Sequence, residues 1–89
     1  MSQEFEEQAN HVRQTLSELA ERSPVVVATA DISGLAVWQL VALWCDHLPG
    51  TTWRDIVSNW SVDLMHDVLA TFIVWAENQQ GDVDEIFLN

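Results

Sequence analysis

The sequence predicts an all-α protein, a small four- or five-helix bundle around a central apolar helix at about residues 34–47. Two observations favour this fold class. Apolar residues recur at helical spacings of three and four positions through most of the chain. Proline and glycine separate the periodic segments, most clearly at Ser23-Pro24 and Pro49-Gly50.

The length limits the chain to one domain. Eighty-nine residues fall well below the size at which chains divide. We therefore expect a helical domain over residues 1–81, followed by an acidic-hydrophobic C-terminal tail over residues 82–89. A core this small leaves stability marginal. Because 48% of the residues are apolar, some apolar surface is expected to face another chain.

The first helix is expected over residues 3–22. Its apolar residues are spaced by four, three, four and three positions, which places them on one stripe. The stripe consists of Phe5, Ala9, Val12, Leu16 and Leu19. Ser23-Pro24 ends this helix, since a residue before proline is pushed out of the α region.

Residues 24–30 leave two interpretations open. Three successive valines favour an extended chain. Alternatively, Ser23 caps a new helix with Pro24 in its first turn. The pattern favours a short helix or an extended linker over a strand paired with the tail.

The central helix is expected to begin after a cap at Asp31 or Ser33 and to run to about His47. Only Gln39 and Asp46 share a polar line on this helix, with His47 to one side. A helix that is apolar on nearly every side is normally buried on nearly every side.

Two further helices follow Pro49-Gly50. A capping box starting at Thr52 predicts a short helix. Ser61 is expected to cap the last helix, which should run to Gln80 and end at Gly81. Val74 interrupts its polar face.

Charge restricts the classes of partner. Fourteen acidic residues and three arginines give a net charge of -11, which a phosphate backbone or an anionic membrane repels. Direct nucleic-acid binding and membrane binding are therefore not expected, whereas a basic protein would be attracted. The first residues are acidic and lack the apolar run of a secretory signal, so we expect a cytoplasmic protein.

No motif predicts catalysis, a cofactor or a metal. Cys45 and His47 lie two positions apart, and Asp63 and His66 lie three apart. A zinc site needs four ligands at regular spacing, which these residues do not provide. Cys45 lies within an apolar run, where a thiol is inert. The protein is therefore not expected to be an enzyme.

The five tryptophans are the most informative feature, because all fall at apolar helical positions. They predict a non-enzymatic interaction module (an adaptor, assembly factor or small regulatory subunit) with an apolar, Trp-containing groove and an acidic rim. The alternative is an acidic inhibitor of a basic protein, such as an immunity protein, an antitoxin or a nucleic-acid mimic. A homo-oligomer, in the simplest case a homodimer, is also expected. The predicted partner-binding residues are Trp38, Trp44, Trp53, Trp60, Trp75, Val74 and Phe87.

Overall fold

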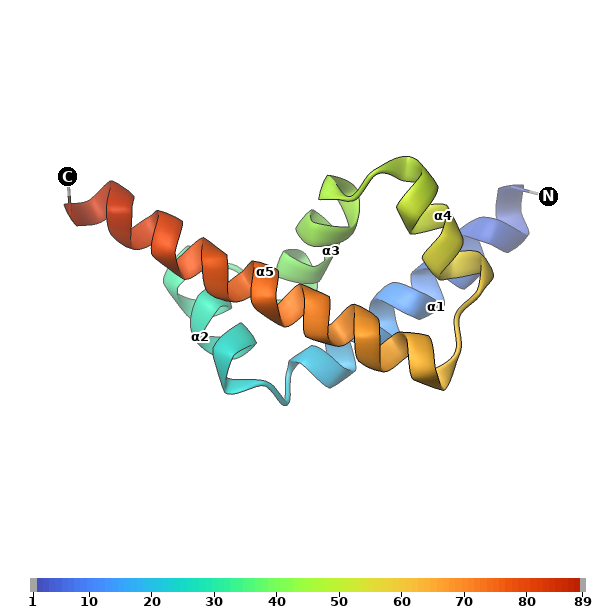
Figure 1. Cartoon of the computed structure of the whole chain (residues 1–89), viewed down its shortest axis with the longest axis horizontal. Helices are drawn as coiled ribbons and strands as arrows, with labels where there is room; N and C mark the ends of the chain where they lie inside the picture. The colour runs from blue at the N-terminus through green and yellow to red at the C-terminus, as the bar shows by residue number, and fades with distance from the viewer. Residues whose placement is uncertain (1, 89) are drawn as a thin grey trace.

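Residues 2–88 form five helices, as the computed structural model shows (Figure 1). The structure describes the backbone of residues 2–88 and the side chains of residues 3–80. The helices are α1 (Ser2–Ala20), α2 (Pro24–Ser33), α3 (Val37–His47), α4 (Gly50–Ser58) and α5 (Val62–Leu88). The predicted all-α bundle is confirmed.

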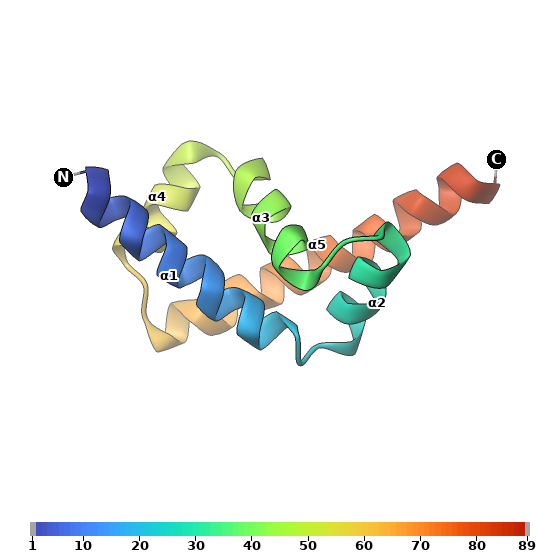
Figure 2. The same ribbon diagram turned by 180° about the vertical axis from the view of Figure 1, so that it is seen from behind.

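The bundle is elongated, with extents of 47 × 23 × 19 Å. Helix α5 runs along the long axis, and α1 and α5 carry the two chain ends to opposite ends of the molecule (Figures 1 and 2). Helix α1 packs against α3, α4 and α5, while α2 packs mainly against α5. Helix α3 packs against α1, α2 and α5.

The stripe on α1 faces the core as predicted. Ala9, Val12 and Leu16 are buried, and Phe5 and Leu19 are partly buried. The regular helix ends at Ala20, two residues before the expected end, and a turn leads to Ser23.

Residues 24–30, for which the sequence left a helix and an extended chain open, are helical and belong to α2. The Ser23 hydroxyl accepts a hydrogen bond of 3.4 Å from the Val26 N–H, and Pro24 occupies the first turn, where its missing N–H costs nothing. Helix α2 ends at Gly34, whose φ of 71° is readily adopted by glycine. Asp31 and Ser33 therefore belong to α2, and the prediction that one of them caps the central helix is wrong.

Helix α3 begins at Val37, three residues later than expected. The Gln39 side-chain oxygen accepts a hydrogen bond of 2.9 Å from the Ala36 N–H, which satisfies one free donor at this end. Leu40, Val41, Trp44 and Cys45 are buried. The expectation of burial on nearly every side is wrong, because Trp38 is 61% and Leu43 52% exposed.

The starts of α4 and α5 differ in how well the sequence predicts them. Helix α4 begins directly after Pro49, so Thr52 lies inside it and does not cap it. Ser61 caps α5 as predicted, accepting a hydrogen bond of 3.2 Å from the Leu64 N–H. The backbone of α5 continues through Gly81 to Leu88, so the expected end at Gly81 is wrong. A helix-interior glycine costs only about 1 kcal/mol, and no proline follows to stop the helix.

Aromatic contacts join the central helix to the last helix. The Trp44 and Phe72 rings lie 5.4 Å apart at 60°, and Phe72 and Trp75 are stacked with centroids 5.9 Å apart. Phe72 is fully buried, and such pairs add stability beyond the area they bury. These contacts fix the relative positions of α3 and α5, which form the walls of the candidate site.

Candidate functional site: two hollows along the last helix

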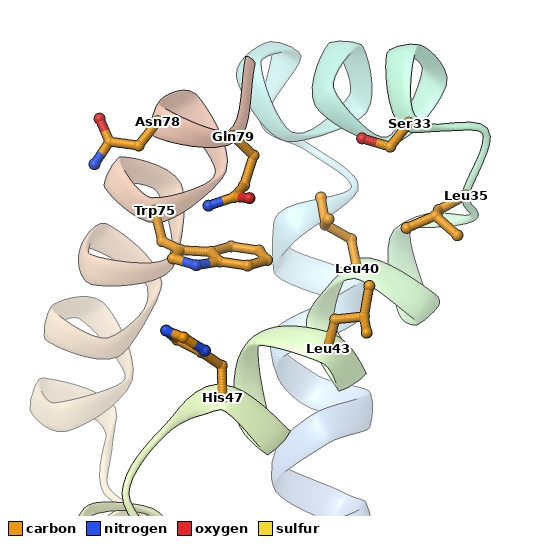
Figure 3. A pocket seen from close by; sticks show the side chains of 8 residues that line it. All are labelled: Ser33, Leu35, Leu40, Leu43, His47, Trp75, Asn78 and Gln79. Atoms are coloured by element: carbon orange, nitrogen blue, oxygen red, sulfur yellow. The ribbon is translucent and has the colours of Figure 1, made fainter. Parts of the chain in front are cut away.

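A groove of about 600 Å³ lies between α3 and α5, closed at one end by the corner between α2 and α3 (Figure 3). Its volume falls within the range of ligand-binding clefts. Leu40 and Leu43 come from α3, Leu35 from the corner, and Trp75 from α5. The polar lining residues are Ser33, His47, Asn78 and Gln79.

Trp75 is the central side chain of this groove. Figure 3 shows its indole ring between the Gln79 amide and the His47 imidazole, with Leu40 and Leu43 across the groove. Because Trp75 stacks on Phe72, its ring is held by the core while it lines the groove. A rigid, partly buried tryptophan beside exposed Leu43 is the composition that protein-binding sites favour.

A second hollow lies where α3, α4 and α5 meet. It holds about 200 Å³, and its floor consists of Trp44, Leu48, Ile56, Leu64 and Val68. Thr52, Asp67 and Thr71 complete its lining. An adjoining hollow of about 390 Å³ shares Thr52, Ile56 and Leu64 and adds Asp55 and Asn59.

Among the residues that line the groove and the second hollow with its extension, the acidic ones border the second hollow and the extension. Within the described side chains, the groove beside Trp75 is lined by neutral groups and His47. Asp67 on α5 and Asp55 on α4 border the second hollow and its extension, and both are exposed. The Thr71 hydroxyl and the Asn59 amide donate hydrogen bonds to the backbone carbonyls of Asp67 and Asp55. These two polar side chains are therefore engaged within their own helices, whereas the carboxylates face solvent.

The structure separates the predicted partner-binding residues. Trp75 lines the groove, Trp44 lines the second hollow, and Val74, next to Trp75, is 58% exposed. The other three tryptophans lie outside both hollows, and the Phe87 side chain lies outside the described residues.

Trp53, Trp60 and Trp38 differ in their surroundings. Trp53 and Trp60 are partly buried against the core, with the Arg13 guanidinium 4.8 Å from the centroid of the Trp53 ring. Arg54 similarly lies 5.8 Å from the centroid of the Phe5 ring. Such cation–π contacts are worth about 0.5–1 kcal/mol at exposed sites. Trp53 therefore has a structural role at the junction of α1 and α4, while Trp38 is an exposed side chain of α3 that lines neither hollow.

Of the eight residues that line the groove, the sequence-based prediction of partner-binding residues included only Trp75. Leu43 and His47 follow Leu40 at i+3 and i+7 on α3, so a helical stripe could have identified them together. Asn78 and Gln79 follow Trp75 by one turn on α5. Without knowledge of which helices meet, these positions look like ordinary solvent-facing residues.

The chemical candidates from the sequence do not converge. In the part of the chain that the structure describes, no three His, Cys, Asp or Glu residues lie close enough to hold a metal ion. Cys45 is buried, and burial raises the pKa of its thiol to about 11 although nearby Arg13 opposes the shift. His47 lies on the groove lining.

Comparison with known proteins finds no matching family model, no similar curated protein and no similar solved structure. Among the described helices, none is by itself long and apolar enough to span a bilayer, although α2 and α3, bent by 90°, together reach that length and composition.

Proposed function

We propose that this protein is a non-enzymatic interaction module, such as an adaptor, an assembly factor or a small regulatory subunit. It binds a segment of a basic partner protein in the groove between α3 and α5. The observation that carries the proposal is the set of apolar side chains Leu40, Leu43 and Trp75 around an open groove of about 600 Å³.

The groove offers apolar surface that a partner can bury. Leu43 is 52% exposed, and full burial of a leucine is worth about 1.5–3 kcal/mol, so covering its remaining surface contributes about 1 kcal/mol. Trp75 supplies a preordered anchor because Phe72 already holds its ring. Ser33, Asn78 and Gln79 provide hydrogen-bonding groups that fix the orientation of the partner.

The charge selects a basic partner. The net charge is -11, and two of the three arginines lie over aromatic rings. A basic protein is therefore attracted over the whole surface, which raises the association rate more than the affinity.

The second candidate is an acidic inhibitor of a basic protein, such as an immunity protein, an antitoxin or a nucleic-acid mimic. The same charge balance favours it. The two functions differ in the consequence of binding. An inhibitor abolishes the activity of a nuclease or nucleic-acid-binding partner, whereas an adaptor leaves its partner active.

Site-specific photocrosslinking in the native host tests the proposal. A photoreactive phenylalanine derivative replaces Leu43 in the groove or, as the matched control, Val62, which is 67% exposed and lies outside both hollows. We expect the Leu43 position to capture a basic protein that the Val62 position does not. Equal capture at both positions, or none, would refute the groove as the binding site.

A further inference from the structure

The second hollow combines an apolar floor with one carboxylate at its rim, and a second carboxylate borders the adjoining hollow. Its volume of about 200 Å³ is smaller than the clefts that hold drug-sized ligands, and is suited to a single side chain. Leu64 and Val68 lie in the floor, with Asp67 at the rim. Asp55 borders the adjoining hollow on α4. A partner segment with one apolar side chain and cationic neighbours would complement both the apolar floor and the carboxylates.

Both hollows lie along one flank of α5. The second hollow uses Leu64, Asp67 and Thr71, and the groove uses Trp75 and Asn78. These positions are spaced by three, four, four and three residues, which is a single helical stripe. At 1.5 Å per residue, the two hollows are centred about 14 Å apart along α5.

An α-helix is the conformation of partner that this surface accepts. No strand occurs among residues 2–88, so the surface presents no sheet edge to pair with an extended segment. An extended ligand would place many of its backbone polar groups against an apolar surface, whereas a helix satisfies its own backbone hydrogen bonds and offers side chains. Positions i and i+7 to i+11 of a helix share one face and span about 10–17 Å, which matches the separation of the hollows.

We propose that the partner segment is a basic amphipathic helix that lies along α5, with one apolar anchor in the groove at Trp75 and another in the hollow at Trp44. Its lysine or arginine side chains flank the second anchor and lie beside Asp55 and Asp67. This assignment rests on the proposed function and specifies the partner that the same surface binds.

The inference is tested by measuring the binding of three synthetic peptides of about 18 residues to the full chain. The first places leucines at i, i+4, i+7 and i+11 on one helical face and lysines at the flanks. The second has the same composition with leucines at alternate positions, and the third replaces lysine by glutamate. We expect only the first peptide to bind.

In an NMR titration, the indole N–H signals of the tryptophans report where the peptide binds. Trp75 reports the groove, Trp44 reports the second hollow, and exposed Trp38 is the negative control. Shifts at both Trp75 and Trp44 support the inference. Shifts at Trp75 alone overturn the two-anchor helix but leave the groove as the binding site. Shifts at neither residue contradict the proposed function as well.

Neutralising selected acids tests whether the peptide is attracted by the carboxylates near the second hollow or by the net charge of the whole protein. The double variant Asp55→Asn/Asp67→Asn should weaken the first peptide about two- to five-fold, as expected for exposed charges at a rim. The control Glu4→Gln/Glu7→Gln removes the same charge from exposed positions on α1 that line neither hollow, and should change the affinity less than two-fold by the same reasoning. Equal weakening by the two double variants would show that the acids of the hollow do not contact the peptide.

Discussion

The side-chain amide of Gln80 donates a hydrogen bond of 2.7 Å to the hydroxyl oxygen of Thr29, joining α5 to α2. Thr29 is the one polar residue among the buried side chains that the structure describes. Its hydroxyl lies 2.8 Å from the Val25 carbonyl oxygen and 3.2 Å from that of Ala76. This buried connection holds α2 against α5 and so positions the corner that closes the groove.

Replacing Thr29 by valine tests this connection. Thr29→Val keeps the shape but removes the hydroxyl, leaving the Gln80 amide without its acceptor there. We expect the free energy of unfolding to fall by about 1–3 kcal/mol in urea denaturation. Thr29→Ser keeps the hydroxyl and loses one methyl group, so it should cost about 1 kcal/mol. A valine variant as stable as the wild type would show that the hydrogen bonds contribute nothing net.

Tryptophan truncation distinguishes the two sides of α3. The sequence pattern predicts that Trp38→Ala and Trp44→Ala are both more damaging than Trp53→Ala. In the structure Trp44 is 3% and Trp38 61% exposed, so the expectation changes for Trp38. Trp44→Ala should cost about 3–5 kcal/mol, and Trp38→Ala about 0.5 kcal/mol. Urea titration followed by circular dichroism measures both, and comparable losses would contradict the orientation of α3.

The helices were predictable because their signals are local. Ser23 and Ser61 act as caps through hydrogen bonds to residues three positions later. The stripe on α1 needs only its own spacing. By contrast, α3 is apolar on nearly every side, so its own pattern cannot indicate which side faces solvent. That choice depends on where α1, α2 and α5 pack.

The candidate site was predictable only in part for the same reason. Trp44 and Trp75 are apolar positions on helices that the sequence already indicates. Leu43, His47 and Gln79 become neighbours only once α3 crosses α5. The acidic rim was expected around one groove, yet Asp67 borders the second hollow and Asp55 borders the hollow that adjoins it.

The Cys45 thiol predicts a loss of stability at high pH. Burial raises its pKa from 9.0 to about 11, with Arg13 opposing the shift. The unfolded thiol ionises first, so this contribution to stability is complete below about pH 9 and is lost as the pH rises toward 11, at up to about 1.4 kcal/mol per pH unit.

The composition makes this experiment selective, because the chain contains no lysine and no tyrosine. Apart from the terminal amine, Cys45 is therefore the group that titrates between pH 9 and 11. We expect the free energy of unfolding of the wild type to fall over this range and that of Cys45→Ala to stay nearly constant. Parallel pH profiles for the two proteins would show that the thiol does not ionise differently on unfolding.

Salt should stabilise the protein. Fourteen acids on a small surface repel one another, and screening over a Debye length of about 10 Å at 0.1 M salt relieves that repulsion. We expect the melting temperature to rise between low and moderate sodium chloride. A flat or falling melting temperature would indicate that local contacts already compensate the acids.

The last prediction concerns self-association. Leu43 is 52% and Val74 58% exposed, beside the groove and on its flanking helix, and a symmetric dimer is the commonest closed assembly that covers such a surface. We expect a homodimer at tens of micromolar protein. Each protomer carries a charge of -11, so dimerisation should strengthen as salt screens the repulsion.

Light scattering coupled to size-exclusion chromatography over a dilution series measures this equilibrium. Leu43→Asp adds a charge to the apolar surface and should shift the protein to monomer, whereas Val62→Asp, outside both hollows, should not. Because the dimer covers the groove, it should compete with the basic helical peptide, and the apparent affinity for that peptide should fall as the protein concentration rises. A constant mass of 10.1 kDa at every concentration and salt would rule out the dimer, and the groove would then be open to a partner at all concentrations.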